Sequence, residues 1–242
     1  MAEPTNNRWG VTTDTRAQTQ DIAIDQGLRS YMLRVYNYMG SGLALSGIVA
    51  YLAATTGLWQ AIAATPLKWV VMLAPLGMLF LVAARLERMS AFSTQAFYWA
   101  FVAVDGLSLG YIFHAYTATS IAKVFFITAA MFGSVSLWGY VTKADLSKYA
   151  GFLIMGAVGL IIAGLVNLIL ESAMMSFVIS VVTVLVFTGF TAYSTQQIRQ
   201  SYDYVGHDAT WVTKGAVFGA LNLYILFMGL FQALLSLFGN RE

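Results

Sequence analysis

The sequence contains no cysteine, and charged residues make up only 10% of its 242 residues. The lack of cysteine excludes disulfides, thiolate metal sites and thiol catalysis. Soluble domains carry roughly 25% charged residues, so the low charge content argues against an ordinary water-soluble domain. The formal net charge of +2 is slight and the basic residues are dispersed, which gives no indication of nucleic-acid binding.

The sequence does have seven long apolar stretches, with most charges in the short breaks between them. A membrane-spanning helix needs about 20 apolar residues to cross ~30 Å of hydrocarbon. The stretches are continuous rather than alternating, which is unlike a membrane β-barrel. We therefore predict an all-α polytopic membrane protein with seven transmembrane helices. The predicted helices lie at residues 35–55, 68–86, 93–114, 121–141, 150–170, 174–197 and 213–238.

The N-terminal segment before the first apolar stretch is polar and carries charges of both signs. It has no apolar core followed by a small-residue cleavage site, so we do not expect a signal peptide there. We predict a polar cytoplasmic arm over residues 1–30, with disorder as one option, and a transmembrane domain over residues 31–242. The first helix is then expected to be an uncleaved anchor.

Lysine and arginine are distributed unevenly between the connecting segments, and cytoplasmic segments carry the excess. With the N-terminus inside, the inner set is Arg8, Arg16, Arg29, Arg34, Arg85, Arg88, Lys143, Lys148, Arg199 and Lys214. The outer set is Lys68, Lys123 and Arg241. This bias predicts a cytoplasmic N-terminus and a C-terminus on the opposite side of the membrane.

The second predicted helix contains Pro75 near its middle. Proline cannot donate to the carbonyl of Val71, so a kink is expected there. The kink is compatible with simple packing, and it is also compatible with a hinge or with a freed carbonyl that faces a polar cavity.

Small residues recur four apart in two of the predicted helices, as in Gly159 and Ala163 and in Gly215 and Gly219. In lipid this spacing lets helix backbones approach closely. We interpret it as packing within one chain rather than as a dimer interface.

Signatures of enzymes are absent. The sequence has neither a phosphate-binding glycine-rich loop nor an HExxH zinc motif. His114 and His207 lie at a helix end and in a predicted loop, so no Ser–His pair is expected within the membrane. We predict a protein that is not an enzyme and that has no cofactor and no metal site.

Asp105 is the one acidic residue near the centre of a predicted helix. An ionised carboxylate there costs about 2.5–3.5 kcal/mol on insertion scales. It should therefore face the bundle or water, be paired, or be protonated. Asn167, Asn222 and Ser108 lie at a similar depth and are candidate partners. A role in an ion or proton path and a structural hydrogen-bonding role both remain open.

The sixth predicted helix ends in a polar cluster from Thr191 to Gln197. Such a cluster could line a wet crevice, or it could mark the helix as it emerges into the cytoplasm. On its placement in the sequence we favour emergence.

Three segments and the seven-helix layout resemble the Bax inhibitor family. The segments run from Gly133 to Ser147, from Val186 to Ile198 and from Ala220 to Phe227, and the likeness covers roughly residues 30–240. The string Thr142-Lys-Ala-Asp-Leu-Ser147 is its most specific part. The resemblance implies a central seventh helix wrapped by the other six. It also implies a calcium leak that is closed by two aspartates sharing a proton.

The sequence departs from the family pattern at both aspartates. The matching positions are Ser194 and Leu226. Paired carboxylates sense pH because like charges in contact raise one pKa. Serine does not titrate in this range and leucine cannot bind a proton, so the pair cannot operate here. Arg85 or Arg88 resembles the family's basic residue that swings toward the sensor, and without aspartates it is expected to be only an anchor at the membrane surface.

Two functional hypotheses follow from the resemblance. The first is a weak cation channel, leaking calcium, without the aspartate-pair pH gate. In this hypothesis Asp105 is a relocated carboxylate in a wet path, or Leu226 completes an apolar plug. The second is a non-conducting regulator that binds a membrane-anchored protease, or another membrane partner, in quality control or stress response. Both place the protein in a lipid bilayer, with a bacterial inner membrane as the expected location.

Overall fold

A computed structural model describes the backbone of residues 10–85, 89–206 and 208–240, and the side chains of these residues except 10–25 and 83–85. The long helices are α1 (Gly10–Thr55), α3 (Leu67–Arg85), α4 (Ala91–Ser108), α6 (Ala118–Val141), α7 (Ala150–Leu170), α8 (Ala173–Val205) and α9 (Ala209–Phe238). Short helical turns connect them: α2 (Leu58–Ala63), η2 (Leu109–Tyr111), α5 (Ile112–Ala115) and η3 (Leu146–Tyr149).

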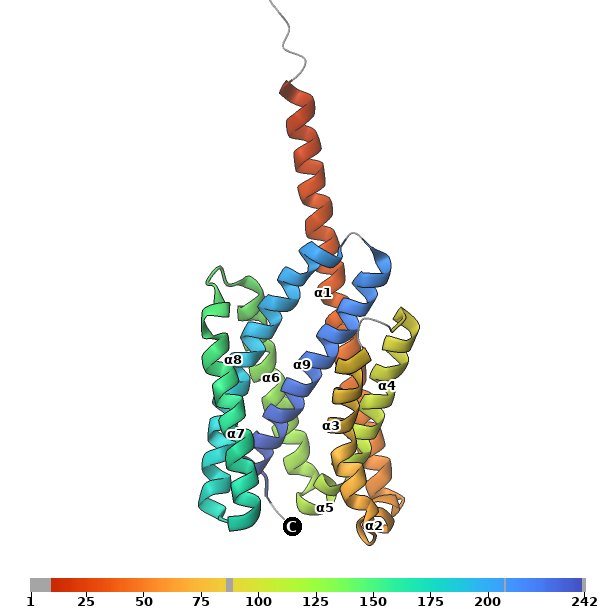
Figure 1. The fold of residues 1–242 in the computed structure, drawn as a ribbon, viewed down its shortest axis with the longest axis vertical. Coiled ribbons are helices and arrows are strands. Elements are labelled where there is room, and N and C mark those ends of the chain that lie inside the picture. Colours follow the sequence, from red (N-terminus) through yellow and green to blue (C-terminus); the bar gives the residue numbers. More distant parts are fainter. Residues whose placement is uncertain (1–9, 86–88, 207, 241–242) are drawn as a thin grey trace, which may run out of the picture.

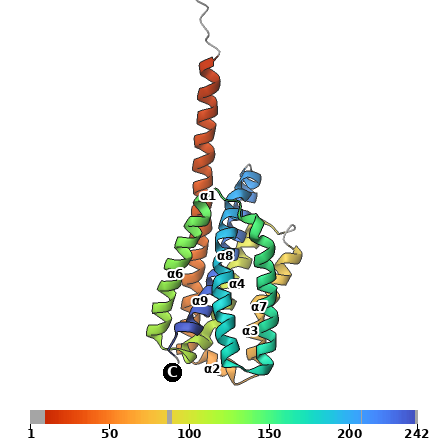
Figure 2. The same ribbon diagram turned by 90° about the vertical axis from the view of Figure 1, so that its left-hand side faces the viewer.

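The fold is an all-α bundle of alternating up and down helices, as expected for a polytopic membrane protein. Within the described ranges, 6 helical segments are long and apolar enough to cross a membrane. A shorter apolar segment, Leu67–Val82 in α3, lies at the position of the predicted second span. The N-terminal part of α1 projects from one end of the bundle, and α9 ends at the other (Figure 1). We call the first end the arm side; Figure 2 shows the projection from a second direction.

The last helix, α9, is central, as the family resemblance implies. Its best membrane-spanning window is 61% buried, against 6% for the helix that includes α7. It packs directly against α1, α4, α6 and α8. α3 packs on α4, and α7 packs on α8, so these two form an outer layer on opposite flanks (Figure 1). The large exposed apolar side chains of α3 and α7 therefore face where lipid would be.

The helix boundaries differ from the prediction mainly at the start of α1 and at the end of α8. α1 begins at Gly10 rather than near residue 35, and α8 continues to Val205 rather than ending near residue 197. Helical hydrogen bonding needs no apolar run, so hydropathy marks only the part of a helix that lies in lipid. The pattern also misses α2, whose Trp59 and Ile62 pack with Ala53 after a turn at Gly57, where φ is 77°.

Glycines set the distances between several helices. A Cβ on Gly106 of α4 would lie 2.6 Å from the backbone oxygen of Ser46 in α1, and a Cβ on Gly219 of α9 would lie 3.1 Å from Ile198 in α8. The expected close packing within the chain therefore holds for Gly219. It does not hold for Gly159, where a Cβ would have no neighbour within 4 Å.

Pro75 lies inside α3, which is one helix from Leu67 to Arg85. The proposed hinge at this position stays a prediction.

Candidate functional site

Asp105 is tied to the central helix. The hydroxyl of Tyr224 on α9 donates a hydrogen bond to Oδ2 of Asp105 on α4, with 2.7 Å between the oxygens. Tyr224 is 1% exposed, and its ring packs edge-on against Phe101 of α4 at 6.0 Å between ring centroids. The contact lies within the predicted span Ala91–Ala115 and joins α4 to α9. A buried tyrosine hydroxyl needs a partner, and the carboxylate provides one.

The residues proposed from depth alone are not the partners of this carboxylate. The Nδ2 of Asn167 donates to Ser176 Oγ at 2.7 Å, and Oδ1 of Asn167 accepts from the backbone of Ser172 at 3.1 Å. Asn167 therefore closes the turn between α7 and α8. Asn222 is exposed on α9. Ser108 Oγ donates to the main-chain oxygen of Asp105, not to its carboxylate.

The polar cluster of α8 lies inside the bundle. Thr191, Ser194, Thr195 and Gln196 are between 0% and 5% exposed, and only Gln197 of the cluster faces outward. The expectation that these residues mark an emerging helix is therefore wrong. The reason is that α8 continues for two further turns to Val205, so the cluster lies among α1, α6 and α9 rather than at a helix end.

A chain of hydroxyl groups crosses three helices beside this cluster. Tyr36 on α1 lies 2.7 Å from Ser136 on α6, and Ser136 lies 2.9 Å from Thr195 on α8. Thr195 Oγ1 donates onward to the carbonyl of Thr191 at 2.8 Å. The chain links α1, α6 and α8 by polar groups that need no water, and it satisfies them in an apolar surrounding.

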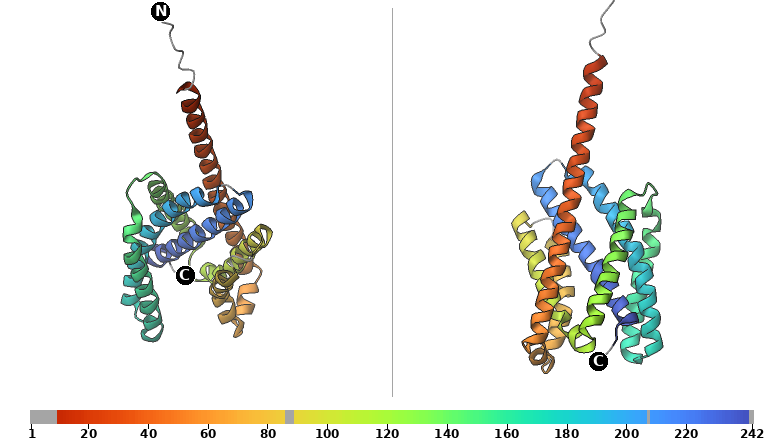
Figure 3. Two further views of the ribbon diagram at one scale, coloured as in Figure 1. Left: turned by 45° about the horizontal axis from the view of Figure 1, so that its top comes forward. Right: turned by 180° about the vertical axis from the view of Figure 1, so that it is seen from behind.

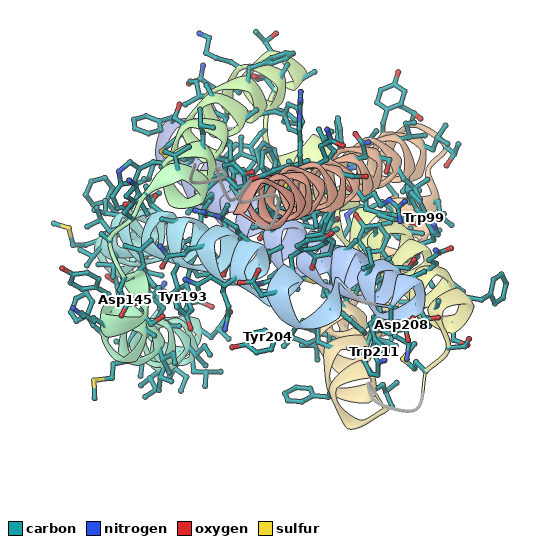
Figure 4. All side chains as sticks on the ribbon, turned by 90° about the horizontal axis from the view of Figure 1, so that it is seen from above. Trp99, Asp145, Tyr193, Tyr204, Asp208 and Trp211 are labelled. Atoms are coloured by element: carbon teal, nitrogen blue, oxygen red, sulfur yellow. The ribbon has the colours of Figure 1, made fainter. Side chains whose placement is uncertain are left out.

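Gln196 fixes the loop between α6 and α7. Its Nε2 donates to the carbonyl of Ala144 at 2.7 Å, and its Oε1 accepts from the backbone N–H of Leu146 at 2.9 Å. Asp145 caps the start of η3 by accepting from the N–H of Ser147 at 3.0 Å. Figure 4 shows this loop, marked by Asp145, beside the part of α8 that carries Tyr193. Two of the segments that carry the family resemblance thus hold each other, which gives the string at 142–147 a structural role.

Ser194 and Leu226 are both buried, at 4% and 6% exposed. The antiparallel packing of α8 and α9 indicates their register. Ser180 donates to Ser236 at 3.1 Å, and seven residues along α8 the ring of Phe187 occupies the space beside Gly229. Seven more residues along α8, and seven fewer along the antiparallel α9, place Ser194 at the level of Asn222. Leu226 is four residues from Asn222, which is about 6 Å along α9 at 1.5 Å per residue. The two positions are therefore about one helical turn apart in level.

The structure does not describe the side chains of the two predicted basic site residues. Arg85 ends α3, and its side chain lies outside the described part of the structure. Arg88 also lies outside the described residues. Sequence reasoning did not single out Tyr224, Tyr36 or Ser136. A tyrosine in the middle of an apolar helix was the available signal for Tyr224, because its hydroxyl must find a partner there.

The chain has relatives over nearly its whole length. The family model described as inhibitor of apoptosis-promoting Bax1 matches residues 28–242. A protein of Caulobacter vibrioides is 39% identical over 244 residues, covering 96% of this chain and 98% of its own length. A protein of Rickettsia prowazekii is 38% identical over 233 residues, covering 96% and 97%. Inner membrane protein YbhL of Escherichia coli is 38% identical over 219 residues, covering 89% and 94%.

The clamp by Gln196 generates the first prediction. Gln196→Leu removes both a donor and an acceptor and leaves the N–H of Leu146 without a partner, so we expect it to destabilise the protein by about 2 kcal/mol. Gln197→Leu, a change at the exposed neighbour, should leave stability nearly unchanged. Thermal unfolding of the two detergent-solubilised variants measures the difference. Equal melting temperatures for the two variants would contradict the clamp.

Proposed function

Since the chain belongs to the Bax inhibitor family, we propose that it is a weak cation leak, for calcium in the first place, that works without a paired-carboxylate pH gate. The observation that supports this proposal is the hydrogen bond between Asp105 and Tyr224. It holds an acidic group against the central helix α9, inside a span that otherwise lacks charge. Intramembrane carboxylates commonly mark ion or proton pathways.

One carboxylate suits a leak better than a storage site. Calcium prefers carboxylate and carbonyl oxygens and is bound by about 6–8 oxygen ligands in stable protein sites. Among the residues that the structure describes, no three His, Cys, Asp or Glu side chains gather. An ion at Asp105 would therefore be held weakly, and conduction requires binding that is weak enough to allow exit.

The absence of a pH gate follows from Ser194 and Leu226. Both are buried on neighbouring helices, and in our proposal they stand where the sequence resemblance implies the paired aspartates of the family. Serine can hydrogen-bond there without titrating, and leucine does neither. In our proposal the resting state is closed by apolar packing around α9 instead.

We also propose that the arm side faces the cytoplasm of a bacterial cell. At the arm side lie the part of α1 where it leaves the bundle, the loop between α6 and α7, and the α8–α9 junction (Figure 1). These segments contain Arg29, Arg34, Lys143, Lys148, Arg199 and Lys214, whereas the starts of α3 and α6, at the other end, contain Lys68 and Lys123. This excess is the pattern of cytoplasmic segments. The inner membrane is proposed as the location because the similar Escherichia coli protein is named for it.

Calcium efflux from proteoliposomes tests the leak. We expect measurable efflux that changes little between about pH 6 and pH 8, the range in which a carboxylate pair would titrate. Asp105→Asn should lower efflux by at least about threefold, because it removes the carboxylate of the span Ala91–Ala115, which would attract a cation, while keeping an oxygen for Tyr224. Asp203→Asn, at an exposed carboxylate near the end of α8, is the matched control.

Two results would contradict this proposal. Efflux equal to that of empty liposomes would exclude conduction. A steep, reversible pH dependence that Ser194→Ala abolishes would show that a gate still operates at that position.

Restoring the two acids tests the register of α8 and α9. The double variant Ser194→Asp/Leu226→Asp should make efflux pH-dependent, because two carboxylates about one turn apart can share a proton. Each single variant should remain flat with pH, since neither creates a pair. A flat profile in a folded double variant would mean that the two positions do not meet.

A second function is favoured by the shape of α1. This helix projects far beyond the bundle on the arm side, and an isolated projecting helix is a natural site for a partner (Figures 1 and 2). We propose, as the alternative, a non-conducting regulator that engages a membrane-anchored protease through this arm.

Deleting residues 1–25 separates the two functions. If the arm binds a protease, a photo-crosslinker placed in the arm should capture a membrane-anchored protease in cells, and the deletion should abolish the associated stress phenotype while calcium efflux stays unchanged. Loss of efflux on deletion, or a normal phenotype without the arm, would contradict the regulator.

A further inference from the structure

A cavity of about 600 Å³ lies between α1 and α6, away from Asp105. Its α1 wall runs from Arg29 to Leu43, its α6 wall runs from Ala129 to Tyr140, and Phe227 of α9 contributes to its floor. Figure 3 shows α1 and α6 from behind as two separated helices with α9 crossing between them. The cavity therefore lies on the perimeter of the bundle, where a membrane would be, and we call it the α1–α6 groove.

Missing side chains create the hollow. Gly40 on α1 and Gly133 on α6 both line the groove, and a Cβ at either position would have no neighbour within 4 Å. Direct contact between the two helices is limited in the described structure, and the hydrogen bond between Tyr36 and Ser136 is their link. In a bilayer the solvent around the helices is hydrocarbon, so an open apolar volume of this size would be filled by lipid or by another apolar segment.

The groove changes polarity along its length. Its arm-side end carries the exposed guanidinium of Arg29 and the side chain of Tyr140. A second guanidinium, that of Arg199, lies 5.5 Å from the centre of the Tyr140 ring. The inner end is formed by Leu43, Phe132 and Phe227 and has no charge. One end is thus suited to an anion and the other to hydrocarbon.

The length of the groove matches one leaflet. From Arg29 to Leu43 the helix rises about 21 Å at 1.5 Å per residue. One leaflet with its headgroup region is roughly 20 Å thick. A second apolar cavity, of about 630 Å³, continues from Leu43 toward the opposite side, and no charged residue lines it. Only the arm-side half therefore combines a cation with an apolar channel.

The width argues against a transmembrane helix as the occupant. The hydroxyls of Tyr36 and Ser136 bridge α1 and α6 at 2.7 Å, which closes the groove to anything deep and broad at that level. A helix with its side chains is about 10–12 Å across. A single acyl chain is much thinner and can lie along the channel that remains.

We propose that the α1–α6 groove is a binding site for one phospholipid of the arm-side leaflet. The acyl chain lies along Gly40 and Gly133 toward Phe227, and the phosphate is bound at Arg29. Arginine pairs with phosphate through two parallel N–H···O bonds, and the nearby guanidinium of Arg199 adds favourable charge. The combined charge selects an anionic headgroup over a zwitterionic one.

Spin-labelled lipids test the site in the full chain reconstituted in nanodiscs. The probes are phosphatidylglycerol and phosphatidylcholine with a label on the acyl chain, and the motionally restricted fraction of each is measured. The wild-type protein should prefer phosphatidylglycerol by about fivefold, the factor that corresponds to about 1 kcal/mol per basic residue at a membrane surface. Arg29→Gln should move this preference most of the way to one, with Arg199 providing the remainder, whereas Arg34→Gln, at an exposed arginine that does not line the groove, should preserve it.

Filling the hollow separates the acyl chain from the headgroup. Gly133→Leu and, on the facing wall, Gly40→Leu should each lower the restricted fraction of both lipids. Gly159→Leu, on the exposed face of α7, should not. Two leucine variants on different helices guard against a single variant that fails to fold, and unchanged melting temperature verifies each.

Three outcomes would overturn the proposal. The first is a restricted fraction in both folded groove variants equal to that of Gly159→Leu. The second is equal headgroup preference in Arg29→Gln and Arg34→Gln. The third is a dimer formed through α1 and α6, because the groove would then be covered by protein. Cross-linking between copies that carry Gly40→Cys and Gly133→Cys would detect it.

Discussion

Polar atoms inside a hydrocarbon layer have no water to satisfy them, and this constraint organises the interior of the bundle. Within the described part of the chain, every fully buried side-chain nitrogen or oxygen has a hydrogen-bond partner. Asp105 is satisfied by Tyr224, and Ser136 by Tyr36 and Thr195. Each of these bonds joins different helices, so the requirement to satisfy polar groups also fixes which helices meet.

α1 takes part in the hydroxyl chain, packs against α4 beside Asp105, and borders both cavities. Its backbone at Ser46 packs closely against Gly106 of α4, the residue that follows Asp105. Its Tyr36 begins the hydroxyl chain toward α8. The central helix α9 carries Tyr224 and also packs against α1, α6 and α8, the three helices that the hydroxyl chain joins. A shift of α1 relative to α9 would therefore disturb the carboxylate contact and the hydroxyl chain together. This coupling is a property of packing and does not need a titrating pair.

The approximate positions of the apolar helices could be predicted from the sequence, because long charge-free runs have few other physical explanations. Within the described residues, six of the seven are long enough to span a membrane and Leu67–Val82 is shorter. The start of α1 and the end of α8 could not be predicted, since a helix outside lipid leaves no hydropathy signal. The burial of Asp105 was predictable from the cost of a charge in hydrocarbon. Its partner was not, because depth along separate helices does not define rotation about their axes. Asn167 and Tyr224 could both have been candidates by depth, and only the packing of α4 on α9 decides between them. The polar cluster of α8 was wrongly predicted to mark a helix end for a related reason. A run of threonine and glutamine does not indicate whether these side chains face water or hydrogen-bond to a neighbouring loop.

The two kinds of acid chemistry make different demands on the fold. A pair of aspartates can hold one proton between them, so the protein senses pH through the loss or gain of that proton. Asp105 instead accepts a hydrogen bond from a tyrosine hydroxyl, which is a weak acid and keeps its own proton through the ordinary range of pH. The proton of Tyr224 therefore stays on its hydroxyl oxygen near neutrality. A cation that binds Asp105 would compete with the hydroxyl of Tyr224 for the same carboxylate oxygen. The affinity of the carboxylate for a cation is then set by how readily Tyr224 gives way, and Tyr224 is held by Phe101 and by the packing of α4 on α9. Control of a leak in this chain would consequently reside in helix packing rather than in proton concentration.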